Sequence, residues 1–365
     1  MIAPRLALWV PAVLAAAAVP RAGAKLLLTA KPPLGFNTFD SYGGLNHTDV
    51  LTLADAMSSQ LKPHGYEYLV LDGGWSAGAE CLTLPNGTKT AGECLDEYGQ
   101  PFPDPLRFPD ILNTAAEVNK RGLKLGLWTI RGVYMAAVTA KAKIKGTNYT
   151  VDQLVDTGNP GGGPNGSCLW AKNNLGVNLS HPAAQTYYDN HVAQMASYGI
   201  DFIKADCMMC GPCYTDEVMA FSAAVRKHPK NLVLSYSPGG GNTVEAGRWV
   251  AGQATAPTPG GEGVTGPSTE PLGTMYRIVT DFHGGWYGWG GLQQSLMIQG
   301  NFSEAGLAGA NNTWPDPDML PIGSTWWNKS QEQDDRGQTI MTSFILSHAP
   351  LMVAGKMPLD DKSMQ

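Results

Sequence analysis

The stretch IDFIKADCMMC, residues Ile200–Cys210, places a lysine and an aspartate at the end of an apolar run. The run 200–206 predicts a buried β-strand, and the period-two spacing of Phe202, Lys204 and Asp206 puts their side chains on one face. Such a charge pair is either a structural ion pair covered by a loop or a carboxylate held for chemistry at the mouth of a barrel. The rest of the chain decides between these interpretations.

Short apolar strands alternate with helical patterns on both sides of this stretch. Predicted strands cover 31–39, 66–75, 123–132, 200–206, 231–240, 274–282, a segment before WPDPDML (314–320), and 347–355. Predicted helices cover 47–61, 113–121, 181–198, 217–227 and 331–346. Eight strands with intervening helices favour a (β/α)8 barrel. A doubly wound sheet is the alternative, but no G-x-G-x-x-G follows the first strand, so dinucleotide binding has no support.

Polar side chains fall at or just after the carboxyl ends of these strands. They are Asp72, Arg131, Lys204, Asp206, Ser237, Arg277, Asp281, Asp316 and Asp318. A single polar residue at a strand end usually caps it or forms a turn. So many together favour a site, because barrels build their active sites at this end.

The first 24 residues are typical of a secretory signal peptide. Arg5 precedes an apolar run, Leu6–Val19, and small residues follow at 22–24. The apolar run is too short for a membrane span, so no membrane association is expected after cleavage. We expect 25–365 to form one catalytic barrel domain, secreted or sent to a vacuole or lysosome.

Sequons and cysteines agree with secretion. Eight N-x-S/T sequons predict a glycosylated product: Asn46, Asn86, Asn148, Asn165, Asn178, Asn301, Asn311 and Asn328. Cys81 and Cys94 flank a polar loop and are expected to pair. The other four cysteines can pair in three ways: Cys168, Cys207, Cys210 and Cys213. CMMCGPC lacks a second ligand cluster, so disulfides are favoured over zinc.

Charge and the acidic residues narrow the chemistry. The net charge is −6 and no basic run occurs, which argues against nucleic acid as a partner. Several carboxylates around one mouth allow metal binding or glycoside cleavage. No H-x-H occurs among the seven histidines, so we predict no metal and no cofactor. Glycoside cleavage needs two carboxyl groups, and Asp206 and Asp281 can face each other across the mouth. The predicted partner is a carbohydrate; the sequence does not define the oligomeric state.

Six motifs lie in order along the chain: PPLGFNTF (32–39), GYEYLVLDGGW (65–75), GLKLGLW (122–128), GIDFIKAD (199–206), R-x-x-x-D (277–281) and WPDPDML (314–320). With these motifs the chain resembles a divergent member of glycoside hydrolase family 27, the melibiase-like group of α-galactosidases and α-N-acetylgalactosaminidases. The similarity covers nearly all of the chain after the signal peptide.

The resemblance implies a retaining mechanism with named catalytic residues. Asp206, the aspartate of K-x-D, would be the nucleophile, and Asp281, the aspartate of R-x-x-x-D, would be the acid and base. Asp281 would start protonated, with its pKa raised relative to that of Asp206. Lys204 would help to keep Asp206 ionised.

The resemblance also implies a set of substrate-binding residues: Phe36, Asp72, Trp128, Lys204, Arg277 and Asp318. Phe36 would supply an aromatic wall, and Asp72, Lys204 and Arg277 would bind sugar hydroxyls. Asp316 and Asp318 have an alternative role in stabilising the loop after the seventh strand. Arg131 would bind substrate or pair with Asp72.

Departures from the family pattern leave the sugar open. Gly73 replaces the second aspartate of D-D-x-W, so one hydroxyl acceptor is missing. The loop SPGGGNT (237–243) lacks the side chains that choose between galactose and N-acetylgalactosamine, and 251–271 resembles an insertion. The eighth helix and a C-terminal β-sandwich domain are not expected. We predict an α-galactosidase-like enzyme. The alternatives are the same chemistry on N-acetylgalactosamine or β-L-arabinopyranose, a non-catalytic carbohydrate-binding barrel, and a metal-dependent hydrolase.

Overall fold

The computed structural model describes residues 26–84, 86–90, 92–158, 166–208, 214–237, 243–253, 268–282, 284–287, 290–323 and 332–359. The predicted signal peptide, the loop 238–242 and most of the segment 251–271 lie outside these ranges, as do Cys210 and Cys213.

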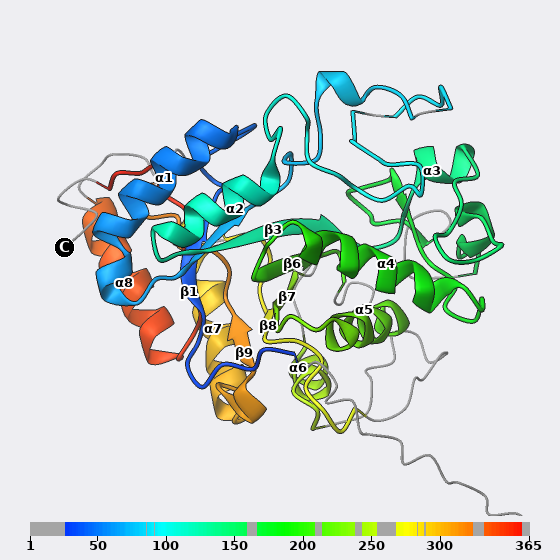
Figure 1. Cartoon of the computed structure of the whole chain (residues 1–365). Helices are drawn as coiled ribbons and strands as arrows, with labels where there is room; N and C mark the ends of the chain where they lie inside the picture. Colours follow the sequence, from blue (N-terminus) through cyan, green and yellow to red (C-terminus); the bar gives the residue numbers. More distant parts are fainter. Residues whose placement is uncertain are drawn as a thin grey trace, which may run out of the picture.

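Eight parallel strands form one sheet, in the order β10, β1, β2, β3, β6, β7, β8, β9 (Figure 1). Their bounds are β1 Leu34–Asn37, β2 Tyr68–Leu71, β3 Lys124–Ile130, β6 Phe202–Asp206, β7 Val233–Ser237, β8 Met275–Arg277, β9 Trp314–Asp316 and β10 Leu351–Val353. Leu320, just beyond β9, forms a parallel bridge with Val353 of β10. This bridge joins the two ends of the sheet, so the predicted (β/α)8 barrel is confirmed.

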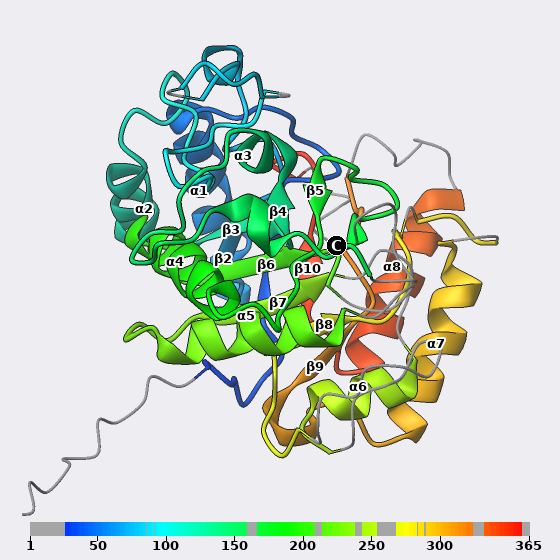
Figure 2. The same ribbon diagram turned by 90° about the vertical axis from the view of Figure 1, so that its right-hand side faces the viewer.

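Helices surround the strands (Figure 2). Their bounds are α1 His47–Gln60, α2 Ile111–Lys120, α3 Met135–Thr139, α4 Ala184–Ser197, α5 Thr215–Lys227, α6 Val244–Val250, α7 Leu292–Glu304 and α8 Glu332–Leu346, with short 3-10 turns η1 Lys62–His64, η2 Ala79–Cys81, η3 Val151–Leu154 and η5 Ala310–Asn312. Within the described part of the chain, no helix has the length and apolar character that a bilayer crossing requires.

Local signals in the sequence explain the helix ends. Asn46 caps α1: its side chain accepts a hydrogen bond from the Asp49 N–H at 3.1 Å, and the Asp49 carboxylate accepts one from the Asn46 N–H. Gly122, two residues after α2, has a φ of 74°, a left-handed conformation that glycine adopts without steric cost. The predicted helices 47–61 and 113–121 are therefore confirmed to within two residues.

Alternate residues of each strand face two different cores. Tyr68, Phe202 and Met275 pack together inside the barrel, whereas Leu69 and Ile203 pack with the apolar faces of the helices. The alternation along each strand that the sequence showed is therefore an alternation of side chains between the barrel interior and the helix layer.

Three features differ from the sequence-based expectations. The seventh strand, β9, begins at Trp314 inside WPDPDML and not before it; the preceding residues form the turn η5 instead. Helices α3, α6 and α7 were not predicted. After β3 the chain adds a short antiparallel pair, β4 Val133–Tyr134 with β5 Asn174–Leu175. Strands of two residues are too short to show a periodic pattern, so they were not predicted.

Among the cysteines that the structure describes, two disulfides cross-link the loops at the carboxyl ends of the strands. Cys81 pairs with Cys94, as predicted. Cys168 pairs with Cys207, which follows the last residue of β6. The second bond ties the long loop after β3 to the end of the neighbouring strand in the sheet.

Candidate active site

The predicted polar residues meet at the carboxyl end of the barrel because strand register puts them on the inner face. Trp128 of β3 is directly opposite Lys204 of β6. Asp72 follows β2 two residues after Val70, whose side chain lies in the inner core. Arg277 ends β8 two residues after the inner residue Met275. The same alternation that builds the inner core therefore delivers these side chains to one place.

Asp206 is held on both carboxylate oxygens. The indole Nε1 of Trp128 donates to Oδ2 at 2.9 Å, and the Cys207 N–H donates to Oδ1 at 2.7 Å. Cys207 has a φ of 58°, uncommon for a residue with a side chain, and its disulfide to Cys168 anchors it there. These bonds fix the orientation of the carboxylate at the end of β6.

Burial raises the pKa of Asp206, and three neighbours oppose that rise. The positive charges of Lys204 and Arg277 and the hydrogen bond from Trp128 each lower the pKa. Lys204 thus acts on Asp206 in the expected direction, although burial outweighs it.

Lys204 makes its direct ion pair with Asp72 and not with Asp206. The Nζ of Lys204 lies 2.7 Å from Oδ2 of Asp72, and both side chains are buried. The other oxygen, Oδ1, accepts the Gly73 N–H at 2.8 Å. Burial lowers the pKa of Lys204, but the negative charges of Asp72, Asp206 and Asp318 raise it by more, so the net change is upward. Lys204, Asp72 and Asp206 therefore form one charged network, in place of the isolated Lys204–Asp206 ion pair considered from the sequence.

A second group lies across β7 from the first. Arg277 contacts Asp281 and is 3.4 Å from Oδ2 of Asp318; it also donates to the Ser237 hydroxyl at 3.1 Å. The side chain of Asp281 is 60% exposed, so it faces solvent at the mouth. Strands β6 and β8 are separated by β7, roughly 10 Å along the sheet, a gap that carboxylates projecting toward the barrel axis can narrow.

Asp318 holds the loop that carries Asp281. It is buried, has a φ of 82°, and its Oδ2 accepts the Phe282 N–H at 2.7 Å. Its own N–H donates to Asp316 at 2.9 Å. Burial and the charge of Asp318 raise the pKa of Asp316 to about 6. Both aspartates therefore support this loop, the alternative role raised for them; substrate binding by Asp318 stays a prediction.

Phe36 is not an aromatic wall, which corrects the expectation from the sequence. It is completely buried, lies opposite Leu69 in the register, and packs in the helix-facing core. The alternation of β1 turns it outward. Phe39, three residues later and 51% exposed, is the ring near the mouth, with the Lys204 Nζ 5.7 Å from its centre.

Arg131 does not pair with Asp72, which corrects a second expectation. It follows β3 and is oriented toward helix α5, where it contacts Glu217 at 2.5 Å. Its guanidinium stacks on Tyr214, 3.1 Å from the ring centre. Its backbone N–H donates to the Asp206 carbonyl at 3.2 Å. Arg131 is a buried structural residue behind the site.

Asp40 is a site residue that the sequence analysis missed. It lies in the loop after β1, in the motif FNTFD, and is buried. Burial, together with the charges of Asp318, Asp72 and Asp281, raises its pKa to about 7, although Lys204 lowers it. The sequence could have indicated Asp40, because it follows the end of a strand, which is the criterion that selected the other aspartates.

The described residues contain no cluster of three or more histidine, cysteine, aspartate or glutamate side chains arranged to hold a metal ion. The loop 238–242, expected to bear on the choice between galactose and N-acetylgalactosamine, lies outside the described ranges.

Comparisons with known proteins agree with the motifs. α-Galactosidase 3 of Hypocrea jecorina is 25% identical over 187 residues, which is 49% of this chain and 26% of that protein. The match thus spans about a quarter of that relative's length. No protein-family model matches the chain.

Solved structures extend the similarity over most of the chain. A GH27 β-L-arabinopyranosidase from Geobacillus stearothermophilus aligns with a TM-score of 0.74 and 26% identity, covering 92% of this chain and 74% of that one. α-Galactosidase I of Mortierella vinacea aligns with a TM-score of 0.58 at 18% identity, over 92% of this chain and 70% of that one, and supports the fold alone.

Proposed function

Because this chain is a divergent member of glycoside hydrolase family 27, we propose that it removes a terminal sugar from oligosaccharides or glycoconjugates with retention of configuration. The observation that carries the proposal is the environment of Asp206. Its carboxylate is held by Trp128 and Cys207 beside the Lys204 charge, an arrangement suited to a nucleophile that must attack from one fixed direction.

The reaction would proceed in two displacements. Asp206 attacks the anomeric carbon while Asp281 gives its proton to the leaving oxygen, so a C–O bond forms at Asp206 as the glycosidic C–O bond breaks. Asp281 then takes a proton from water, and the resulting hydroxyl attacks the same carbon and frees Asp206. Asp281 suits both steps because its exposed side chain reaches solvent while Arg277 holds it.

Buried polar groups beside Asp206 would bind the ring hydroxyls. Asp72 and Lys204 form one connected pair, and Arg277 approaches from the other side of β7. A pair in which one member donates and the other accepts can satisfy neighbouring hydroxyls, and it rejects sugars that leave either group unpaired.

α-Galactosides are the leading substrate, and one observation favours a second sugar. A Cβ at Gly73 would lie 3.8 Å from the ring of Trp128, and Gly73 itself has no side chain to accept a hydroxyl. β-L-Arabinopyranose has the ring hydroxyls of galactose but lacks its hydroxymethyl group. A site with one acceptor fewer suits a sugar with one hydroxyl fewer.

We further propose that 25–365 acts as one catalytic domain in the secretory pathway or outside the cell. The predicted N-terminal signal peptide, the eight sequons and the two disulfides between described cysteines support this.

The test is hydrolysis of the 4-nitrophenyl α-galactoside, α-N-acetylgalactosaminide and β-L-arabinopyranoside by the wild type and by Asp206→Ala and Asp281→Ala. We expect turnover of one glycoside and its loss in Asp206→Ala. Asp281→Ala should regain turnover with azide, which needs no proton from the enzyme, and proton NMR should detect the retained anomer first.

Asp55→Ala is the matched control, because Asp55 is an exposed aspartate of α1 paired with Arg121. Full activity of Asp206→Ala would exclude Asp206 as the nucleophile. An inverted first product would exclude double displacement. Galactose binding without turnover by a folded wild-type protein would favour a carbohydrate-binding barrel, and inhibition by a chelator would favour a metal-dependent hydrolase.

A further inference from the structure

The turn 74–77, in the loop after β2, forms one wall of a pocket of about 400 Å³ beside the site. Gly74, Ser76 and Ala77 line this pocket, and Trp128 of β3 lines it as well. Protein atoms that face a cavity have fewer packing partners than atoms in the core. The position of the turn therefore depends on the contacts that other parts of the protein make with it.

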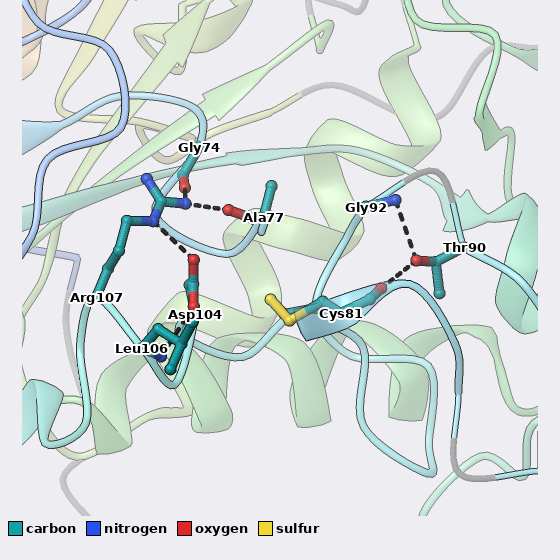
Figure 3. Close-up of a disulfide and its surroundings, with 9 residues drawn as sticks. Gly74, Ala77, Cys81, Thr90, Gly92, Asp104, Leu106 and Arg107 are labelled. Atoms are coloured by element: carbon teal, nitrogen blue, oxygen red, sulfur yellow. Dashed lines mark hydrogen bonds and ion pairs between the residues drawn. A yellow bond between two sulfur atoms is a disulfide. The ribbon is translucent and has the colours of Figure 1, made fainter. Parts of the chain in front are cut away.

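Arg107 and Asp104 supply most of those contacts (Figure 3). One terminal nitrogen of the Arg107 guanidinium donates to the carbonyls of both Gly74 and Ala77. The Nε of the same side chain is 2.7 Å from Oδ2 of Asp104. The Asp104 N–H donates to the Trp75 carbonyl at 2.9 Å. These two residues, the Asp104–Arg107 clamp, therefore hold three carbonyls of the turn.

The clamp is itself fixed in place. Asp104 is buried, and its Oδ1 accepts the Leu106 N–H at 3.0 Å (Figure 3). Gly78 leaves room for this carboxylate, because a Cβ on Gly78 would overlap Oδ2 of Asp104. The N–H of His47, the first residue of α1, donates to the Arg107 carbonyl at 2.9 Å. The clamp thus ties the loop after β2 to the start of α1.

The Cys81–Cys94 disulfide loop holds the remaining carbonyl of the turn. The Cys94 N–H donates to the Ser76 carbonyl at 2.7 Å. On the other arm of this loop, the Thr90 hydroxyl donates to the Cys81 carbonyl and accepts the Gly92 N–H at 3.1 Å (Figure 3). All four carbonyls of the turn therefore accept hydrogen bonds, three of them from the clamp.

Two groups of the candidate active site depend on where this turn lies. Trp75, a residue of the turn, donates its indole N–H to the Trp128 carbonyl at 2.7 Å, and Trp128 donates its own to Asp206 at 2.9 Å. Asp72 lies two residues before the turn, and its Oδ1 accepts the Gly73 N–H at 2.8 Å. A shift of the turn would therefore move the indole that orients Asp206 and the carboxylate of Asp72.

We propose that Arg107 is a positioning residue for the reaction: by holding the turn 74–77, it sets the place from which Trp75 and Trp128 orient Asp206. This inference rests on the proposed glycosidase function and adds to it a residue outside the groups that touch the sugar. The planar guanidinium has donors that point in two directions, toward the carbonyls and toward Asp104. A lysine ammonium is a point charge and does not reproduce that geometry.

The first test is a proton–nitrogen NMR spectrum of the full protein labelled at its tryptophan indoles. Each indole N–H gives one signal, and Trp75→Phe and Trp128→Phe assign two signals by their loss. We expect Arg107→Lys to shift both, because the chemical shift of an N–H proton depends on the length of its hydrogen bond. A Trp128 signal that stays in place in folded Arg107→Lys would overturn the proposal, even if the Trp75 signal moves.

Arg121→Lys is the matched control and should leave both signals in place. The Arg121 Nε is 2.6 Å from Asp55, and its Nη1 donates to the Glu117 carbonyl at 2.9 Å, so it also joins a carboxylate to a carbonyl. Its side chain is 23% exposed, against 20% for Arg107. Arg121 ends α2 and precedes β3, at the end of the barrel opposite the site.

The second test is kinetic. We expect Arg107→Lys to lower kcat/KM for the glycoside that the wild type hydrolyses by roughly tenfold, about the effect of one hydrogen bond to a charged group. Arg121→Lys should leave kcat/KM unchanged. Combined with Trp128→Phe, Arg107→Lys should cost less than the product of the two single losses, because both act on Asp206. Multiplicative losses would show that Arg107 does not act through Trp128.

The outcomes separate this proposal from the proposed function. If the wild type hydrolyses no glycoside, the proposed function fails, and the NMR comparison alone decides whether Arg107 positions the two indoles. If glycosides are hydrolysed but the Trp128 signal does not respond, the function stands and the positioning role is rejected. If Arg107→Lys does not fold, Asp104→Asn replaces it, because it keeps the arginine but weakens its anchor. The same shift, or its absence, then decides.

Discussion

The indole nitrogen of Trp128 lies 2.9 Å from Oδ2 of Asp206, so a residue of β3 orients the carboxylate at the end of β6. The two strands pair in parallel, with Trp128 opposite Lys204 and Ile130 opposite Asp206. Trp75 in turn donates to the Trp128 carbonyl at 2.7 Å. Asp206, the proposed nucleophile, is thus positioned by a chain of indole donors that extends back to the loop after β2. Trp128 also lines the adjoining pocket.

Trp128→Phe tests this orientation. The substitution keeps an aromatic ring but removes a hydrogen bond that lowers the pKa of Asp206. We expect kcat/KM to fall about 10- to 100-fold, the range for a hydrogen bond to a charged group. The acidic limb of the pH profile of kcat/KM should also move to higher pH, because the free enzyme then ionises Asp206 less readily. A profile that keeps its acidic limb in place would contradict this role.

Lys204 and Asp72 should act as one unit. Asp72→Asn removes the direct partner of Lys204, and Lys204→Met removes a charge that lowers the pKa of Asp206. We expect Lys204→Met to cost more in kcat/KM than Asp72→Asn, because it affects two carboxylates. A double-mutant cycle measures the coupling: the double variant should lose less than the product of the two single losses. Independent, multiplicative losses would show that the pair does not act together.

The Arg131–Glu217 pair should stabilise the fold and not contribute to binding. Both side chains are buried, and Glu217 also accepts from the Tyr188 hydroxyl and, at 3.3 Å, from the Val177 N–H. Arg131→Met leaves the Glu217 charge buried without its cation. We expect the free energy of unfolding in urea to fall by about 3–5 kcal/mol, with KM unchanged in the protein that remains folded.

Arg226→Met is the matched control for that measurement. Arg226 pairs with Glu270 at 2.8 Å, but the Glu270 side chain is 71% exposed. Its loss should change the free energy of unfolding by less than about 1 kcal/mol. Equal effects of the two arginine substitutions would show that burial of the Arg131 pair adds nothing.

Asp40 should make stability depend on pH. Its pKa in the folded protein is raised from 3.8 to about 7, mainly by burial. The folded state therefore holds a proton that the unfolded state has released, and stability falls as pH rises between those two values. Above about pH 7 the folded protein bears the full free-energy cost of the charged, buried Asp40 carboxylate. Each unit of difference between the folded and unfolded pKa corresponds to about 1.4 kcal/mol. Below pH 3.8 Asp40 is protonated in both states and the cost is absent.

Asp40→Asn keeps the shape and removes the ionisation. We expect its melting temperature to exceed that of the wild type at pH 8 and the difference to shrink steadily toward pH 4. Thermal unfolding of both proteins across this range measures it. A difference that stays constant with pH would mean that Asp40 is not the titrating group.

Strand and helix positions were largely predictable, because the side chains that an element buries recur at a regular spacing along the sequence. The predicted strand 200–206 contains β6, and the predicted helix 217–227 forms most of α5. The prediction failed where an element is too short to show such a spacing. β9 is three residues long and contains a proline, and β4 and β5 have two residues each. Such short strands are defined by their partners and not by their own pattern.

The sequence by itself determined that Lys204 and Asp206 share an inward face at the end of a barrel strand, because side chains alternate strictly along a strand. It determined equally that the other acids lie at strand ends. Only the tertiary structure decided which groups meet: Lys204 with Asp72, Trp128 with Asp206, and Arg131 with Glu217. It also turned Phe36 into the helix-facing core. Those outcomes depend on strand register and on loops from distant parts of the chain, and the spacing of residues along one strand contains no information about either.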